Sequence, residues 1–327
     1  MRRKSVSYAK YGYIFCIPFV LAFLIFSLYP LIYTAVIGFT DLKGLGTTDF
    51  KILDDPLRNF QTVLKNPSFQ KSLSNTAILW IVNFIPQILL ALLLTAWFTN
   101  KRRQIKGQGL FKVLFYMPNI MTMATIAILF ATLFGYPAGP VNDLFLKLGW
   151  TKEPVNFLLQ KWTTRGIVSF IQFWMWYGNT MIVLIAGVLG INPELYEAAE
   201  IDGASGKQAF FFVTLPNLRT ILLFTLVTSM VGGLQMFDIP RLLRDGGPDS
   251  ATLTSVLFIR NQAFSGSYLY NRAAAASMML FAIIAVLSGI LFYVMRDKYA
   301  IAQRKIEKKY EKEYKKSLKR QGGLKNE

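Results

Sequence analysis

Histidine is absent from the 327 residues, and cysteine occurs once, as Cys16. The chain therefore lacks two thiols for a disulfide, a Cys/His set for a metal ion, and a Ser–His or Cys–His pair for nucleophilic catalysis. The segment Gly203-Ala204-Ser205-Gly206-Lys207 lacks the spacing of a phosphate-binding loop and follows no predicted strand. We expect a chain that is not an enzyme, with no catalytic residue, no metal and no bound cofactor.

Charged residues are missing from six long segments, although the chain carries 36 basic and 18 acidic residues. The uncharged segments cover residues 14–39, 72–100, 113–142, 166–193, 220–237 and 273–295. Five of them reach the roughly 20 residues with which a helix crosses about 30 Å of hydrocarbon, and 220–237 is slightly shorter. Since every backbone amide in lipid needs a partner within its own segment, such segments form helices. The sequence predicts an all-α, polytopic membrane protein with six transmembrane helices.

Two other interpretations explain the apolar segments less well. Hydrophobic residues make up 53% of the chain, and a large water-soluble protein with buried helices would show an amphipathic periodicity that these segments lack. A cleaved secretory signal is disfavoured because the first apolar segment is far longer than the hydrophobic region of a signal peptide. We expect the first helix to remain as a membrane span.

The distribution of basic residues predicts the orientation. With both termini placed in the cytoplasm, the inner segments hold 23 Lys and Arg residues and the outer loops hold 13, with nine acidic residues on each side. This asymmetry satisfies the positive-inside rule, and the cluster Lys101-Arg102-Arg103 and the tail 296–327 contribute most of it. A net charge of +18 also suits nucleic-acid binding. Because the basic residues flank membrane segments, they favour anionic lipid as the partner instead.

A polar insert between the fourth and fifth apolar segments predicts a compact helical knob. Asn192 is suited to cap a helix that begins at Pro193 and runs to about Asp202, with glutamates near its positive end. Gly203 is suited to a left-handed turn, and a second helix is expected through the phenylalanines at 210–212 to Pro216. Local physics leaves two interpretations open, a docking element for a partner and an ordinary connector.

The same insert carries a motif. Glu197-Ala198-Ala199 is followed after three residues by Gly203, and after nine more by an aliphatic residue, Val213, and then Leu215-Pro216. This pattern resembles the loop by which permeases of ATP-binding cassette (ABC) importers engage their ATPase, with Val213 where isoleucine is usual. The resemblance assigns ATPase coupling to Glu197, Ala198, Ala199, Asp202, Gly203, Leu215 and Pro216.

Two further stretches resemble the carbohydrate branch of these permeases, the maltose, glycerol-phosphate and multiple-sugar group. One comprises Tyr13-Ile14-Phe15, Leu28-Tyr29-Pro30-Leu31 and Gly38-Phe39-Thr40-Asp41, and the other comprises Gly246-Gly247-Pro248 and Gln262-Ala263-Phe264. The resemblance implies a type-1 permease fold in the cell membrane, a second permease subunit, two ATP-binding cassette subunits that hydrolyse ATP, and an extracellular solute-binding protein. Two alternatives stay open, a permease for a non-sugar polar solute and an ATPase-independent channel or membrane scaffold.

Polar side chains within the predicted spans are candidates for a solute path, because they are costly in lipid unless they face a partner or water. Sugars present apolar faces and hydroxyl edges, which aromatic rings beside amides complement. The alternative is that these residues lie at the membrane interface or join neighbouring helices. The candidates are Asn119, Thr122, Gln172, Trp174, Trp176, Tyr177, Asn179, Ser229 and Gln235.

The sequence shows only weak domain boundaries. We expect an N-terminal helix with its outer loop (1–71), a five-helix permease domain (72–295, coupling loop about 191–217) and a basic cytoplasmic tail (296–327). Residues 141–150 are too short to span a membrane and predict a helix on the outer face. The tail, with apolar residues spaced by fours, is interpreted either as a short charged helix or as an irregular segment.

Overall fold

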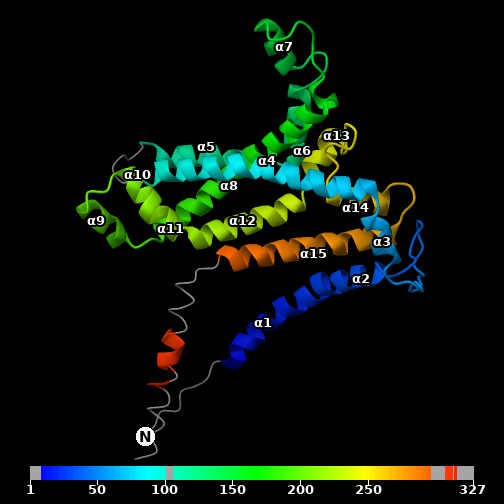
Figure 1. The fold of residues 1–327 in the computed structure, drawn as a ribbon, viewed down its shortest axis with the longest axis horizontal. Coiled ribbons are helices and arrows are strands. Elements are labelled where there is room, and N and C mark those ends of the chain that lie inside the picture. Colours follow the sequence, from blue (N-terminus) through cyan, green and yellow to red (C-terminus); the bar gives the residue numbers. More distant parts are fainter. Residues whose placement is uncertain (1–8, 101–105, 296–305, 312, 315–327) are drawn as a thin grey trace, which may run out of the picture. The chain divides into compact units, whose positions relative to one another are not determined.

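The computed structural model describes residues 9–100, 106–295, 306–311 and 313–314, and within them the protein is helical. The described residues form no strand, apart from an isolated bridge between Thr40 and Ile52. The predicted all-α fold is confirmed (Figure 1). The cluster Lys101-Arg102-Arg103 lies outside the described residues, as does most of the tail, of which 306–311 is helical.

Eighteen helical elements follow one another between Ala9 and Met295. They are α1 (Ala9–Phe23), η1 (Leu24–Leu28), α2 (Tyr29–Ile37), α3 (Arg58–Leu64), α4 (Pro67–Phe98), α5 (Gln108–Ile120), α6 (Met123–Leu133), α7 (Pro140–Lys147), η2 (Phe157–Leu159), α8 (Lys161–Leu189), α9 (Pro193–Ile201), α10 (Gly206–Ala209), η3 (Phe210–Thr214), α11 (Leu215–Asn217), α12 (Arg219–Leu234), α13 (Asp238–Arg244), α14 (Ser255–Phe264) and α15 (Tyr270–Met295).

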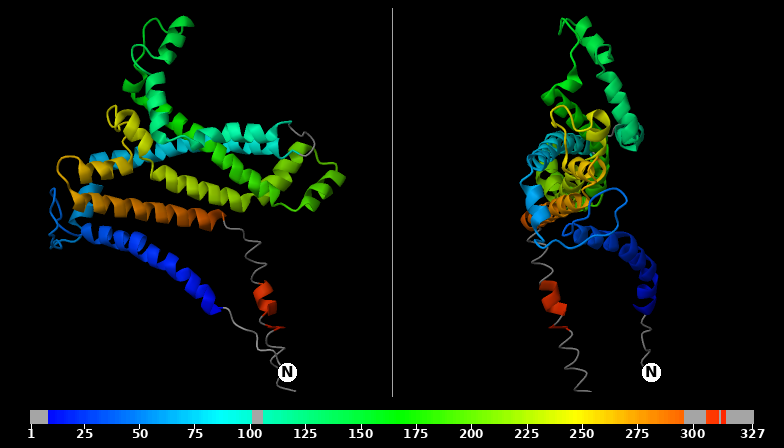
Figure 2. Two further views of the ribbon diagram at one scale, coloured as in Figure 1. Left: turned by 180° about the vertical axis from the view of Figure 1, so that it is seen from behind. Right: turned by 90° about the vertical axis from the view of Figure 1, so that its right-hand side faces the viewer.

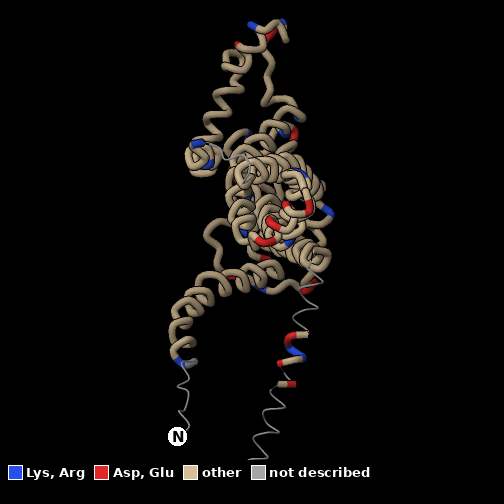
Figure 3. Tube along the Cα trace, turned by 90° about the vertical axis from the view of Figure 1, so that its left-hand side faces the viewer, with Lys and Arg blue, Asp and Glu red and all other residues tan. Residues whose placement is uncertain are grey.

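Five helical segments among the described residues are long and apolar enough to cross a membrane, namely Lys10–Ile37, Pro67–Phe98, Lys161–Leu189, Arg219–Arg244 and Tyr270–Met295. They correspond to five of the six predicted spans. Few charged side chains interrupt these segments, and long stretches of the trace carry none (Figure 3). The protein is therefore a multi-pass membrane protein.

The prediction of one continuous third helix over 113–142 is wrong. The segment contains α5 and α6, separated by a sharp break at Met121 and Thr122. Pro118 removes a backbone donor near the end of α5, and the Thr122 side chain accepts a hydrogen bond from the Thr125 N–H (3.2 Å), which caps α6. If α5 and α6 together form one span, the number of spans is six.

Two π-helical turns, η1 and η3, each precede a proline. Their closing hydrogen bonds run from the Tyr29 N–H to the Leu24 carbonyl and from the Leu215 N–H to the Phe210 carbonyl, which is the i to i−5 pattern of a π turn. The prolines, Pro30 and Pro216, follow one residue later. A proline ring clashes with the carbonyl four residues before it, and that carbonyl lies inside the widened turn in both cases. The extra residue accommodates the proline without ending the helix.

The described chain divides into two compact units. The first comprises the residues up to Phe84 together with Met121–Phe173 and Gly232–Ala285. Its core holds the buried side chains Val63, Phe69, Leu253, Leu257, Phe258, Ala275 and Ala276, and α13 packs against α6 (Figure 2). Gly233 has no room for a side chain, because an added Cβ atom would lie 2.1 Å from Cδ1 of Trp80. This unit thus depends on close contact between α4 and α12.

A buried arginine organises one end of the first unit. Arg165, on α8, is 8% exposed; its Nε donates to the Ala251 carbonyl (2.8 Å) and its guanidinium also donates to Oδ1 of Asn75 on α4. The Asn75 amide in turn donates to the carbonyls of Ser250 (2.7 Å) and Leu253 (3.1 Å). Sequence patterns gave no sign of this network, which holds the loop before α14 against α4 and α8.

The second unit comprises Ile85–Ile120, Trp174–Val231 and the described residues from Val286. In it α5 and α8 approach closely at Gly178, where an added Cβ atom would lie 2.3 Å from the Phe115 carbonyl oxygen. The Gln87 amide donates to Oγ1 of Thr180 (2.7 Å), which joins α4 to α8. These polar groups are satisfied by neighbouring helices, as expected for helices that pack within a membrane.

Helix α7 confirms the predicted helix at 141–150, although it ends at Lys147. Its Asn142 side chain is buried, donates to the carbonyls of Gly135 (2.9 Å) and Val155 (3.1 Å), and accepts from the Val155 N–H (2.8 Å). One side chain therefore fixes both connections of α7 to the rest of its unit. The side of the membrane on which α7 lies stays a prediction.

Candidate functional site

The insert between α8 and α12 begins with the predicted helix. The Asn192 side chain accepts a hydrogen bond from the Glu194 N–H (3.1 Å), Pro193 occupies the first helical position, and α9 ends at Ile201. Gly203 has φ +77°, the left-handed conformation that only glycine adopts without strain. The predicted helix, cap and turn are all confirmed.

The second half of the insert begins with a capping box that the sequence analysis missed. The Ser205 N–H donates to Oε1 of Gln208 (2.8 Å), and the Gln208 N–H donates to Oγ of Ser205 (3.4 Å). The spacing of serine and glutamine was the available signal. From there α10, η3 and α11 continue to Asn217, so the predicted second helix is present, with a π turn at its centre.

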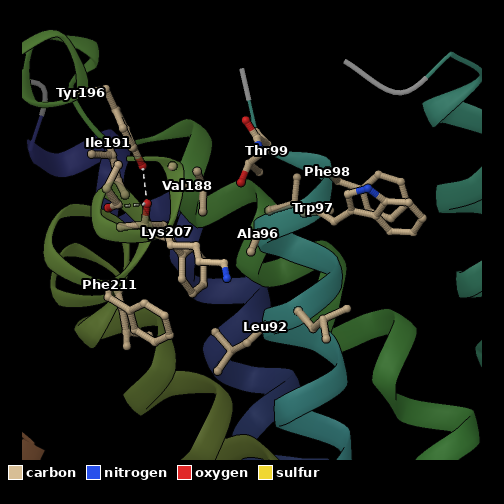
Figure 4. Close-up of a pocket in the computed structure, with 18 of the residues that line it drawn as sticks. Leu92, Ala96, Trp97, Phe98, Thr99, Val188, Ile191, Tyr196, Lys207 and Phe211 are labelled. Carbon is tan, nitrogen blue, oxygen red and sulfur yellow. Dashed lines mark hydrogen bonds between the residues drawn. The ribbon is translucent and has the colours of Figure 1, made fainter. Parts of the chain in front are cut away.

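A side-chain hydrogen bond joins the two halves of the insert. The hydroxyl groups of Tyr196 on α9 and Thr214 on η3 lie 3.0 Å apart, and Figure 4 draws this bond as a dashed line. Thr214 is buried and also lies 3.5 Å from the Ala209 carbonyl. The turn at Gly203 reverses the chain between α9 and η3, and this bond holds the two together. They therefore form one compact element, which we call the knob (residues 192–217).

The exposed surface of the knob combines apolar and acidic side chains. Leu195, Ala198 and Ile201 recur every third residue along α9 and are exposed, Ile201 to 87%. Acidic residues flank this strip on the same helix and just after it. Of the predicted coupling residues, Glu197, Ala198, Asp202, Gly203 and Pro216 are exposed, whereas Ala199 and Leu215 are half-buried. The two alanines of the motif therefore differ in exposure, Ala198 being the more exposed.

A cavity of about 1560 Å³ lies beneath the knob, wholly within the second unit. Its walls come from the last turns of α4 and α8, the start of α5, and the inner side of the knob. Figure 4 shows Leu92, Ala96 and Val188 facing the same space as Lys207 and Phe211. Most of the exposed lining is apolar, although the cavity borders polar helix ends. The sequence analysis did not anticipate it, because its walls come from segments far apart in the chain.

The predicted solute-path residues differ widely in burial. Gln172 and Tyr177 are buried; Asn119, Trp174, Asn179 and Ser229 are half-buried; Thr122, Trp176 and Gln235 are exposed. Thr122 is the cap of α6, and the Asn119 amide donates to the Met175 carbonyl (3.3 Å), which are roles in structure. Gln172, Trp176 and Asn179 follow the helical repeat of α8 and share one stripe of that helix. The solute path stays a prediction.

Comparison with known proteins decides the family. The family described as "binding-protein-dependent transport system inner membrane component" matches residues 64–300, most of the chain. The chain belongs to this family. The family is a membrane permease component of ABC transporters. Among the described residues no group of three or more His, Cys, Asp and Glu side chains is arranged to hold a metal ion.

Individual relatives also match this chain over most of its length. The lactose transport system permease protein LacF of Rhizobium radiobacter is 30% identical, over 88% of this chain and 94% of its own length. The arabinooligosaccharides transport system permease protein AraP of Bacillus subtilis (strain 168) is also 30% identical, over 84% of this chain and 85% of its own. A crystal structure of a bacterial ABC transporter that imports alginate contains a similar chain, with a TM-score of 0.72, 24% identity and coverage of 87% and 94% of the two chains.

Proposed function

We propose that this protein is a permease subunit of an ATP-driven importer and that its solute is a sugar or oligosaccharide. The relatives with 30% identity are named for lactose and arabinooligosaccharide transport, and one of the similar structures contains an alginate transporter with an oligosaccharide-bound periplasmic protein. On this proposal a second permease completes the path, two separate ATPase subunits hydrolyse ATP, and an extracellular binding protein delivers the solute. The knob is the observation that carries the proposal.

The knob has the properties of a docking element. Leu195, Ala198 and Ile201 form an exposed apolar strip on a short helix, and an apolar strip flanked by charged residues is typical of a surface that binds a partner. Glu197 and Asp202 beside the strip supply charge that pairs with basic residues on an ATPase. When the ATPases close on ATP, the knob moves with them, because the Tyr196–Thr214 bond prevents its two halves from moving separately.

The basic residues support the orientation in the membrane. With both termini in the cytoplasm, Lys and Arg number 23 on the inner side and 13 on the outer side, which supports an orientation with the termini and the knob on the side of the ATPases. The solute path on this proposal includes the face of α8 that carries Trp176 and Asn179, which offers an indole face and an amide to a sugar.

The test is solute uptake by vesicles that contain the complete complex. Glu197→Lys reverses the charge beside the docking strip and should abolish ATP-driven uptake. The variant complex should either hydrolyse ATP without transport or lose its ATPase subunits. The matched control is Glu153→Lys, the same change at an exposed residue outside the knob, which should transport normally. Equal uptake by both variants would contradict the coupling role.

The choice of solute and the dependence on ATP need separate measurements. A panel of labelled mono- and oligosaccharides, amino acids and inorganic ions should give uptake of a carbohydrate only. Uptake of a non-sugar solute alone would preserve the importer and refute its substrate class. Flux that continues without an ATPase would instead identify an ATPase-independent channel.

A further inference from the structure

The cavity beneath the knob is larger than a small-molecule site. Its volume of about 1560 Å³ exceeds the roughly 300–1,000 Å³ of pockets that enclose small ligands. Large apolar side chains line it and are far from buried, with Leu89 61%, Leu93 62% and Leu189 77% exposed. Because these residues lie in membrane-spanning segments, hydrocarbon rather than water is the medium that covers them at least cost.

The polar groups of the cavity gather where its helices end. Along α4 the lining residues Leu89, Leu92, Leu93 and Ala96 are apolar, and the lining changes to Thr99 and Asn100 at the helix end. Gln108 and Lys112 border the same region from α5, because the Gln108 amide donates to the Phe98 carbonyl and the Lys112 amine lies 5.7 Å from the centre of the Phe98 ring. The cavity is thus apolar along the spans and polar at their end.

Among the described residues that line the cavity, positively charged groups outnumber negatively charged ones. These groups are two lysines, Lys112 and Lys207, and one glutamate, Glu200. Figure 4 shows the Lys207 amine pointing into the space between α4 and the knob, toward the same side of the cavity as Leu92 and Ala96. A ligand that satisfies the whole lining therefore has a long apolar part and one anionic group.

We propose that this cavity binds an anionic phospholipid, whose acyl chains lie along the last turns of α4 and α8 and whose phosphate contacts Lys112 and Lys207. A second transmembrane helix in this place would have to carry acidic side chains at the level of the two lysines and apolar side chains below them. A phospholipid supplies the anion at the level of the helix ends and hydrocarbon below it. The lipid would then support the inner side of the knob, opposite its docking strip.

The test uses the purified full-length protein and vesicles that contain equal amounts of phosphatidylcholine and phosphatidylglycerol. Native mass spectrometry of the extracted protein should show retained phosphatidylglycerol in preference to phosphatidylcholine. The double variant K112Q/K207Q should lower retention of phosphatidylglycerol about 25-fold, since a lysine near anionic lipid contributes about 1 kcal/mol, or about fivefold. The control K147Q/K152Q removes two exposed lysines outside the cavity and should retain lipid as the unmodified protein does.

A second measurement locates the acyl chains. Phosphatidylglycerol with brominated chains should quench Trp97, which lines the cavity, and this part of the quenching should disappear in Trp97→Phe. Ala96→Trp places an indole in the cavity and should reduce retention of phosphatidylglycerol in a protein whose circular dichroism shows intact helices. Inorganic phosphate should not displace the lipid.

Three outcomes would overturn the proposal. They are equal retention of the two lipids, retention that is unchanged in both K112Q/K207Q and Ala96→Trp, and displacement by inorganic phosphate, which would show a site for free anions only. In the assembled complex, a photoreactive residue at position 96 should crosslink to lipid. Crosslinking to the second permease instead would show that a protein helix occupies the cavity, and would also overturn the proposal while leaving the proposed transport function intact.

Discussion

Replacement of Arg165 by methionine tests the buried network in the first unit. The change keeps an apolar stem of similar length but removes the donors to the Ala251 carbonyl and to Oδ1 of Asn75. Both acceptors are buried, so water replaces the lost donors poorly. Hydrogen bonds to a charged group contribute about 1.5–3 kcal/mol each, which gives about 3–6 kcal/mol for the two.

The net loss should lie toward the lower end of that range, at about 3 kcal/mol. The arginine must be desolvated to reach its 8% exposure, and methionine avoids this cost. Arg165→Lys keeps the charge but lacks the planar fork that reaches two acceptors at once, so about half the loss, roughly 1.5 kcal/mol, is expected.

The assay is reversible denaturation in mixed micelles, followed by circular dichroism, for Arg165→Met, Arg165→Lys and a matched control. Arg58→Met makes the same change at an exposed residue of α3 and should alter the free energy of unfolding by less than about 0.5 kcal/mol. If Arg165→Met cost no more than Arg58→Met, the hydrogen bonds would contribute nothing to stability and the reasoning would be refuted.

Three further predictions concern the knob and the helix contacts of the second unit. Gly203→Ala should accelerate hydrogen exchange of the α9 amides about fivefold, because the left-handed conformation costs an alanine at least about 1 kcal/mol. Gly178→Ala should lower the free energy of unfolding by about 1–3 kcal/mol or more, since its Cβ atom would collide with the Phe115 carbonyl. A double-mutant cycle of Gln87→Leu and Thr180→Val should give a coupling energy of about 0.6 kcal/mol.

Matched glycines provide the controls for the first two. Gly206→Ala lies in the same knob without a positive φ, and its nearest neighbour is the Asn100 side chain at 3.9 Å, so exchange of α9 should not change. Gly166→Ala lies on the same helix as Gly178 with nothing within 4 Å and should be neutral or stabilising. A Gly178 variant as stable as the Gly166 variant would show that α5 and α8 do not pack as described. A coupling energy near zero would show the same for the bond between Gln87 and Thr180.

The approximate limits of five spans were predictable because they depend on local composition. Long uncharged segments have one stable form in lipid, whatever lies beside them. The knob was also predictable, because Asn192, Pro193 and Gly203 act through their own backbone neighbours. The break of the third span was missed although Pro118 and Thr122 signalled it, since apolar length outweighed the two local signals.

Features that depend on distant residues were not predictable. In the sequence, Arg165 is a cation just before an apolar segment. Its burial requires partners near residues 75 and 251, which are 90 and 86 positions away. The walls of the cavity are formed by the ends of α4, α5 and α8 together with the knob. Pattern and composition carry no information on such combinations of segments.

The π turn at Phe210–Thr214 has a consequence for the direction in which the knob faces. A helix rotates by about 100° for every residue, so the one additional residue turns everything before it through that angle relative to α12. Deletion of a single residue there would remove the wide turn that accommodates Pro216, and the strip at Leu195, Ala198 and Ile201 would face a different direction. The direction in which the strip faces is therefore set by a residue count in η3, a segment outside the strip itself.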